Sequence, residues 1–225
     1  TRTAIVTGAA RGLGAATAKT LATQGARVAL ADVRIGEIQS VAKECGTDAR
    51  CYEVDVSQTS QLRQLVNDVV RDFGRIDILV NNAGICPRLP FADSTEADWE
   101  KIVNVNAKSQ YFLMQTVCPV MKKQGGGRII NVASTGGRIG SFANASIYSG
   151  TKGAIVMFSK SVAREVAADG ILINCVAPGV LDTDLMRNLP AERVKAICDQ
   201  IPLKRLGRPE EIAALKDYLK EGGTL

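Results

Sequence analysis

The sequence contains no histidine. Histidine is the side chain that most often exchanges protons near neutral pH, so an enzyme with this sequence must use another general acid or base. The absence also removes a common metal ligand, and the six cysteines are scattered without a C-x-x-C pair. No zinc or other metal site is therefore expected, and the cysteines are interpreted as reduced thiols.

Two further absences narrow the class of protein. The 28 basic and 23 acidic residues leave a net charge of +5 without a basic tract, so neither a nucleic acid nor an anionic membrane surface is an expected partner. No apolar run approaches the roughly 18 residues of a membrane helix, and no signal-peptide pattern is present. With 46% apolar residues the chain can bury a sizeable core. We expect a cytoplasmic protein.

Short apolar segments alternate with longer amphipathic ones. The pattern over 58–73 predicts a helix, because its apolar residues recur at i, i+3 and i+4. Strand–helix alternation favours a parallel sheet, since parallel neighbours need a crossover connection. We predict one α/β domain over 1–225, a doubly wound, mostly parallel sheet of about six strands with helices on both faces. The predicted strands are 3–7, 26–32, 49–54, 76–81, 127–133 and 170–177.

A glycine-rich stretch, "TGAARGLG", follows the first predicted strand and places Gly8, Gly12 and Gly14 directly before a helix. Glycines let the backbone turn sharply and approach a pyrophosphate, whose charge then faces the helix N-terminus. The spacing G-x-x-x-G-x-G differs from the G-x-G-x-x-G fingerprint, and the lysine of a P-loop is absent. A simple tight turn is the alternative.

The second predicted strand ends at Asp32, eighteen residues after Gly14. A carboxylate at that strand tip can accept hydrogen bonds from an adenosine ribose. Aspartate is also a common turn residue. Together with the glycines, it indicates a dinucleotide site.

Further motifs follow in order: "VDVS" (54–57), "NNAG" (81–84), "VNVN" (103–106), "INVAS" (130–134), "YSGTK" (148–152) and "APG" (177–179). Through this ordered set, from residue 1 to about 215, the chain resembles the short-chain dehydrogenase/reductase family. The resemblance implies a Rossmann sheet that binds NAD or NADP. It also implies hydride transfer between the nicotinamide and a ketone or secondary alcohol.

The resemblance also assigns residues. Tyr148 would be the catalytic acid/base, Lys152 its electrostatic partner, Ser134 the ligand of the substrate oxygen, and Asn106 the holder of a water-linked proton path. Asp55 would meet the adenine, "NNAG" would line the adenosine ribose, and "APGVLDT" would run along the nicotinamide. The implied cofactor contacts are Gly8, Arg11, Gly12, Leu13, Gly14, Asp32, Val33, Asp55, Val56, Asn82, Ala83, Gly84, Tyr148, Lys152, Pro178, Gly179, Leu181 and Thr183.

The "YSGTK" spacing shows how a phenol can replace a histidine. Residues four apart share one helix face, so Tyr148 and Lys152 can meet one side of a pocket. A free tyrosine titrates near 10, and a cation within about 4–6 Å lowers such a pKa by roughly 1–3 units. We expect Lys152 to lower the pKa of Tyr148. Without the other motifs, such a pair is more often two surface neighbours.

Two departures from the family pattern stand out. Ser134 precedes Tyr148 by fourteen residues, one more than is usual, so Thr135 is a conceivable substitute. "GRPEEIA" (207–213) is typical of the family's last helix start, but "LKDYLKEGGTL" ends where the family continues to a seventh strand. We therefore expect an unpaired sheet edge. Its consequence is either a homo-oligomer (dimer or tetramer) through helices around 98–123 and 144–168, or a less stable particle.

The loops 86–91, 135–147 and 185–189 should form the substrate walls, and they carry Arg88, Arg138 and Arg187. They predict a pocket for a medium-sized, mostly apolar ketone or secondary alcohol. The arginines could instead hold a carboxylate or an acyl-carrier phosphate, which makes 3-oxoacyl-carrier reduction a variant. A nucleotide-binding relative without turnover is the alternative from another class.

NAD is expected in preference to NADP. The 2′-phosphate of NADP would lie beside Asp32, and two like charges about 4 Å apart repel by roughly 4 kcal/mol at an effective dielectric of 20. Arg11 or Arg34 could offset part of this repulsion.

Overall fold

The chain forms one six-stranded parallel sheet. The computed structural model describes residues 1–141, 144–183, 186 and 189–214. The strand order is β3-β2-β1-β4-β5-β6, so the order reverses between β1 and β4. The fold class and all six strand positions are confirmed. The strands are β1 (Thr3–Thr7), β2 (Arg27–Asp32), β3 (Arg50–Glu53), β4 (Ile78–Asn81), β5 (Gly127–Val132) and β6 (Ile171–Val176).

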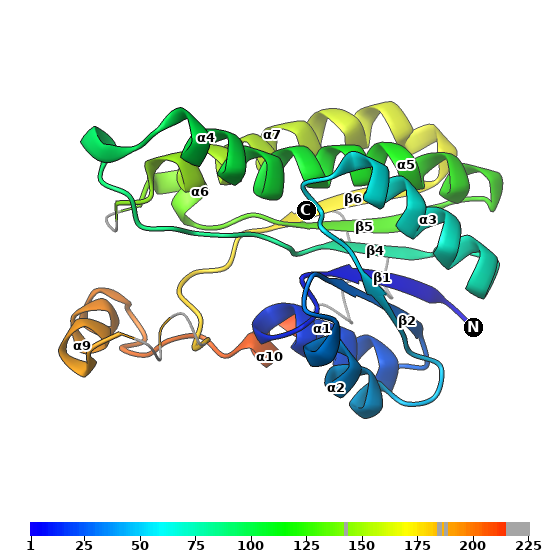
Figure 1. Cartoon of the computed structure of the whole chain (residues 1–225), viewed down its shortest axis with the longest axis horizontal. Coiled ribbons are helices and arrows are strands. Elements are labelled where there is room, and N and C mark those ends of the chain that lie inside the picture. The colour runs from blue at the N-terminus through cyan, green and yellow to red at the C-terminus, as the bar shows by residue number, and fades with distance from the viewer. Residues whose placement is uncertain (142–143, 184–185, 187–188, 215–225) are drawn as a thin grey trace.

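Helices cover both faces of this sheet (Figure 1). On one face lie α3 (Thr59–Phe73), α5 (Ser109–Lys123) and α7 (Ser146–Val166). On the other face lie α1 (Gly12–Thr23) and α2 (Ile35–Cys45), and α10 (Pro209–Ala213) packs against α1. Shorter elements complete the described part: η1 (Phe91–Asp93), α4 (Glu96–Val103), η2 (Asn104–Lys108), α6 (Gly136–Ile139), η3 (Ala167–Asp169) and α9 (Ala191–Gln200).

Two apolar clusters hold the helices to the sheet, and adjacent residues of β1 point into different ones. Ile5 belongs to the cluster beneath α3 and α5, whereas Ala4 and Val6 belong to the cluster beneath α1 and α2. Strands buried on both faces need no polar alternation, which explains their continuous apolar sequence. The predicted apolar stripe on α3 is buried, with Leu62, Leu65, Val66, Val69 and Phe73 all in the first cluster.

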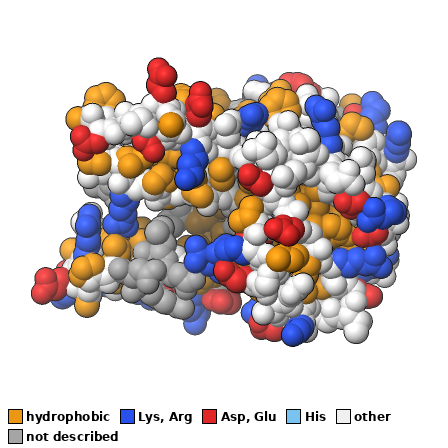
Figure 2. Space-filling view, in the orientation of Figure 1, with side chains coloured by type: hydrophobic (Ala, Val, Ile, Leu, Met, Phe, Trp, Pro, Cys, Tyr) orange, Lys and Arg blue, Asp and Glu red, His pale blue; other side chains and the backbone are white. Residues whose placement is uncertain are grey.

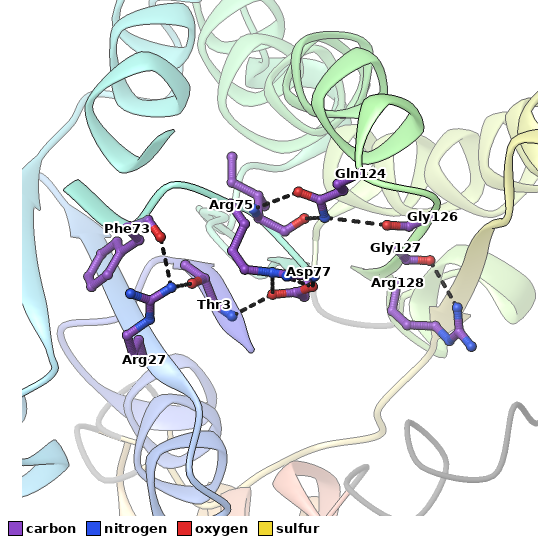
Figure 3. Close-up of polar contacts among 10 residues, drawn as sticks. Thr3, Arg27, Phe73, Arg75, Asp77, Gln124, Gly126, Gly127 and Arg128 are labelled. Atoms are coloured by element: carbon purple, nitrogen blue, oxygen red, sulfur yellow. Dashed lines mark hydrogen bonds and ion pairs between the residues drawn. The ribbon is translucent and has the colours of Figure 1, made fainter. Parts of the chain in front are cut away.

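A polar network links the amino ends of the strands, opposite the carboxyl ends at which a ligand is predicted to bind (Figure 3). The Thr3 amide donates to Asp77 Oδ2 at 2.7 Å, and Arg75 Nη2 donates to Asp77 Oδ1 at 2.6 Å. Arg27 Nη2 donates to Thr3 Oγ1 at 2.9 Å and to the Phe73 carbonyl at 2.7 Å. Burial alone would raise the pKa of Asp77, but the hydrogen bonds and charges around it hold that pKa below its ordinary value. The network stabilises the fold.

The C-terminal predictions are met only in part by the described residues. A helix begins at Pro209, as predicted, and Glu211 caps it by accepting from the Arg208 amide at 2.7 Å. Within the described part of the chain β6 forms the edge of the sheet. The absence of a seventh strand was predicted from 215–225, which lie outside the described residues. Among the described helices, none has the length and apolar character needed to span a bilayer.

Candidate active site

The glycine loop lies where the strand order reverses, and its geometry requires glycine. Gly8 and Gly12 have φ of +64° and +55°, a region that side chains disfavour. A Cβ on Gly14 would lie 2.0 Å from the Gly8 carbonyl oxygen, and one on Gly8 would lie 2.8 Å from Ala83 Cα. The bare loop leads directly into the N-terminus of α1, which is the arrangement that receives a pyrophosphate.

A hydroxyl at the end of β1 ties this loop to the loop after β4. Thr7 Oγ1 accepts from the amides of Asn82 and Ala83, each at 3.1 Å. The Asn82 side chain donates back to the carbonyls of Thr7 and Gly8 at 3.0 and 3.1 Å. The Asn82 side chain thus holds the glycine loop, and its predicted contact with a ribose remains a prediction. Thr7 was not predicted, because a threonine that ends a strand carries no signal by itself.

Asp32 lies at the tip of β2, 5% exposed, and faces the glycine loop. Its Oδ2 accepts from the Ala10 amide at 3.1 Å, and its carboxylate is paired with Arg34, whose Nε donates to Oδ1 at 3.1 Å. Arg34 also lies 3.4 Å from a carboxylate oxygen of Glu37. Arg34 thus forms ion pairs with two carboxylates, those of Asp32 and Glu37, at the position predicted for the ribose.

Further predicted cofactor residues lie on the segments after β2, β3 and β6. Val33 is exposed and Val56 is buried. Asp55 Oδ1 accepts from the Ser57 amide at 2.9 Å. The segment after β6 joins two parts of the site: the Pro178 carbonyl accepts from the Thr135 amide at 3.0 Å, and a Cβ on Gly12 would lie 3.4 Å from Thr183 Cγ2.

Ser134 and Tyr148 meet through their side chains. Ser134 follows the end of β5, and its hydroxyl accepts from the Gly136 amide at 3.1 Å. The same side chain interacts with the Tyr148 phenol on α7 and opposes the rise in that phenol's pKa. The structure therefore brings Ser134 to the phenol, while Thr135 directs its amide to Pro178. The extra residue before Tyr148 does not displace Ser134.

Lys152 lies one turn further along α7 and is 3% exposed. Its Nζ donates to the Val132 carbonyl at 2.7 Å and lies 5.6 Å from the centroid of the Tyr148 ring. A Cβ on Gly84 would lie 3.5 Å from this Nζ, so the last residue of "NNAG" passes directly over the lysine. Burial lowers the pKa of Lys152 to about 8.

Asn106 is fully buried in η2, a π-helical turn between α4 and α5. Its Oδ1 accepts from the Ile85 amide at 2.8 Å, and its Nδ2 donates to the Ile85 carbonyl at 2.9 Å and to Thr151 Oγ1 at 3.2 Å. Thr151 in turn donates to the Tyr148 carbonyl at 2.7 Å. Asn106 thereby links the loop after β4 to α7. The π turn, a feature frequent at functional sites, was not predicted from the sequence.

The pKa of Tyr148 is shifted opposite to the expected direction. Burial raises it above the ordinary tyrosine value, and the hydrogen bond with Ser134 opposes this rise only in part. The prediction that Lys152 lowers the pKa of Tyr148 is therefore wrong. The Lys152 ammonium is directed at the Val132 carbonyl and not at the phenol. A phenol that keeps its proton at neutral pH is suited to donate it.

The loop after β5 packs tightly on α7, the helix that carries Tyr148 and Lys152. A Cβ on Gly137 would lie 2.5 Å from the Lys152 carbonyl carbon and 2.6 Å from the Gly153 nitrogen. This contact holds α6 on α7 and so keeps Ser134 at Tyr148. Figure 2 shows this side of the molecule hollowed between the upper helices and the lower segments, with basic side chains at the rim.

Comparison with known proteins agrees with this geometry. A family model described as "short chain dehydrogenase" matches residues 2–194. The 3-oxoacyl-acyl carrier protein reductase FabG of Thermotoga maritima is 36% identical over 218 residues, covering 96% of this chain and 88% of that protein. The corresponding reductase of Synechocystis sp. is 38% identical over 224 residues, with 96% and 87% covered. Galactitol 2-dehydrogenase of Agrobacterium fabrum is 35% identical over 230 residues, with 97% and 90% covered.

The chain belongs to the short-chain dehydrogenase/reductase family. It is an oxidoreductase that acts on CH–OH groups or the corresponding ketones with a nicotinamide cofactor. The bare glycine loop at the N-terminus of α1 fits the phosphates of such a cofactor.

Proposed function

We propose that this chain is a carbonyl reductase and secondary-alcohol dehydrogenase in which Tyr148 is the acid/base. The observation that carries the proposal is the convergence of Ser134 and Tyr148 at the carboxyl end of β5, with Lys152 and Asn106 buried behind them. The bound nicotinamide supplies or accepts the hydride at the substrate carbon.

The chain's own residues manage the proton. In the reduction direction Tyr148 donates its phenolic proton to the carbonyl oxygen, and Ser134 donates a hydrogen bond to the same oxygen as negative charge develops. The Lys152 ammonium stabilises the phenolate that forms. Asn106 fixes the loop after β4 and, through Thr151, the backbone at Tyr148. Oxidation of an alcohol is the reverse.

The complete arrangement argues against a nucleotide-binding relative without turnover, since such a protein has no use for a buried lysine beside a phenol. A panel of ketones and secondary alcohols, followed at the nicotinamide absorbance, tests this directly. Turnover of at least one of them supports the proposal. Binding of the cofactor without turnover of any of them would favour the inactive relative.

The substrate we propose is a medium-sized, mostly apolar ketone or its alcohol. Phe91 is 87% exposed and Ile139 is 75% exposed on the two loops that follow β4 and β5. These loops are joined by a hydrogen bond from the Leu89 amide to the Asn144 carbonyl at 2.7 Å. Apolar side chains at such an opening favour an apolar substrate.

A 3-oxoacyl chain carried on a protein is the second candidate. Two of the relatives act on such substrates by name. Of the three arginines predicted at the substrate loops, Arg88 and Arg138 are available to a carrier phosphate, while Arg187 lies outside the described residues.

NAD is the cofactor that we propose over NADP. Asp32 and Glu37 share Arg34, so this cluster keeps an excess of one negative charge where a 2′-phosphate would bring close to two more. We expect a higher kcat/KM with NAD for the parent and relaxed discrimination for Asp32→Ala. Arg34→Ala should sharpen the preference, because it removes the neutralising charge. Equal or better use of NADP by the parent would overturn the assignment.

We also propose a homo-oligomer in a reducing compartment such as the cytoplasm. Large apolar side chains are exposed on three helices of the predicted interface: Trp99 on α4, Tyr111 on α5 and Met157 on α7. The chain's six cysteines are all free thiols, which supports the compartment.

A further inference from the structure

One buried glutamine lies near the proposed catalytic residues Tyr148 and Lys152 but has no role in the proposed proton transfer. Gln110 on α5 is 2% exposed. Its Nε2 donates to the Val132 carbonyl at 3.4 Å, whereas its Oε1 is buried without a hydrogen-bond partner in the described part of the chain. An unpaired buried acceptor is destabilising, and a leucine would fill the same space without it. Stability alone therefore does not explain why an amide side chain occupies this position.

Gln110 contacts the proposed catalytic residues through a shared hydrogen-bond acceptor, the Val132 carbonyl oxygen. The Lys152 ammonium donates to the same oxygen at 2.7 Å. A carbonyl oxygen has two lone pairs, so these two donors complete its hydrogen bonding. Val132 ends β5, two residues before Ser134, and the orientation of its peptide bears on both catalytic side chains.

The Gln110 backbone is itself fixed by a ladder of buried amides. Asn81 Nδ2 on β4 donates to the Gln110 carbonyl at 3.5 Å and to Asn131 Oδ1 on β5 at 2.8 Å. Asn131 Nδ2 donates to Ser159 Oγ on α7 at 2.8 Å. The ladder connects two central strands to α5 and to the catalytic helix, so Gln110 reaches Val132 from a fixed base.

We propose that Gln110 is a positioning residue for the catalytic lysine. Its amide holds the Val132 peptide so that the carbonyl faces Lys152 Nζ and keeps the ammonium beside Tyr148. Lysine has a long flexible stem, and without the second donor its acceptor is held less firmly. Small displacements of a catalytic group reduce the rate strongly. The inference rests on the proposed role of Lys152.

Gln110→Leu tests the proposal because it removes both the donor and the unpaired oxygen at nearly constant volume. We expect the Tm to stay equal or rise, kcat to fall about tenfold, and the KM of the carbonyl substrate to change by less than about twofold. A purely structural glutamine would lower Tm and kcat together. Gln115→Leu is the matched control: Gln115 is exposed on the same helix, and its change should leave kcat at the parental value.

Lys152→Met separates failure of the inference from failure of the proposed function. Parental activity in Lys152→Met would refute the role of the lysine itself. A low rate in Lys152→Met with a parental kcat in Gln110→Leu would refute only the inference, as would a joint loss of Tm and kcat. Should Gln110→Leu not fold, Gln110→Met carries the same expectations with an unbranched side chain of similar length.

Discussion

At the scale of single residues, burial dominates the electrostatics of this site. Lys152 and Tyr148 both lie in a poorly solvated environment, which lowers the pKa of the lysine to about 8 and raises that of the tyrosine. Both shifts disfavour the charged form. In the proposed mechanism, the pair would enter the reaction with the phenol protonated and the lysine close to its pKa.

This assignment predicts the pH dependence of reduction. The lysine charge is complete below its pKa and is lost as the pH rises through about 8, whereas Tyr148 stays protonated over the same range. We expect kcat/KM for the reduced cofactor, which reports groups of the free enzyme, to fall above about pH 8. Lys152→Arg keeps its charge and should lose this limb, although its rate is lower. An unchanged limb in Lys152→Arg would assign it to another group.

At the scale of elements, the strands follow from local sequence but their polar connections do not. The strands were predicted as short apolar segments between amphipathic ones, and α3 because its apolar stripe has a helical period. The motifs indicated Ser134, Tyr148 and Lys152, whose roles remain predictions. The sequence could not predict that Lys152 and Gln110 both donate to the Val132 carbonyl. These donors lie 20 and 22 positions from Val132 in the sequence, and the three residues are on different elements. The π turn at Asn106 was missed for a similar reason: its partners lie on other segments.

The network at the amino ends of the strands predicts acid sensitivity. The pKa of Asp77 is lowered in the folded chain, so its stabilisation is complete above its unfolded value of about 3.9 and is lost as the pH falls through the folded value. Asp77→Asn should lower the unfolding free energy at neutral pH by about 1–3 kcal/mol. The parent should then lose more stability than the variant between pH 7 and pH 3, as measured by denaturant titration at both values.

Asp48→Asn is the control for this experiment, because Asp48 is exposed in the loop between α2 and β3. It should behave as the parent at both pH values. Equal acid sensitivity of the parent and Asp77→Asn would show that the network contributes nothing to the pH dependence.

At the scale of the whole molecule, the residues predicted to bind and react lie at the carboxyl ends of the strands, and a structural polar network lies at the amino ends. The glycine loop, Asp32 and the proposed catalytic residues Ser134, Tyr148 and Lys152 all lie toward the carboxyl ends of the strands, on both sides of the reversal between β1 and β4. The Arg27–Asp77 network lies at the amino ends (Figure 3). This separation predicts that Asp77→Asn changes stability with little change in kcat.

The exposed apolar side chains on α4, α5 and α7 predict association at the same scale. We expect a homodimer or tetramer by sedimentation, because the exposed apolar side chains on these helices gain free energy when they are covered. Trp99→Ser with Met157→Ser should shift the distribution toward the monomer. A stable parental monomer at high protein concentration would contradict the proposed interface.

The proposed function requires proton transfer through the phenol of Tyr148, which the variant Tyr148→Phe removes. Phenylalanine keeps the ring and removes only the hydroxyl that meets Ser134. We predict a fall in kcat of at least about 100-fold, in line with general acid–base contributions of roughly 10²–10⁴. Cofactor affinity, measured by titration, should remain within a few-fold of the parent. A folded Tyr148→Phe variant that binds the cofactor and turns over at close to the parental rate would contradict the account.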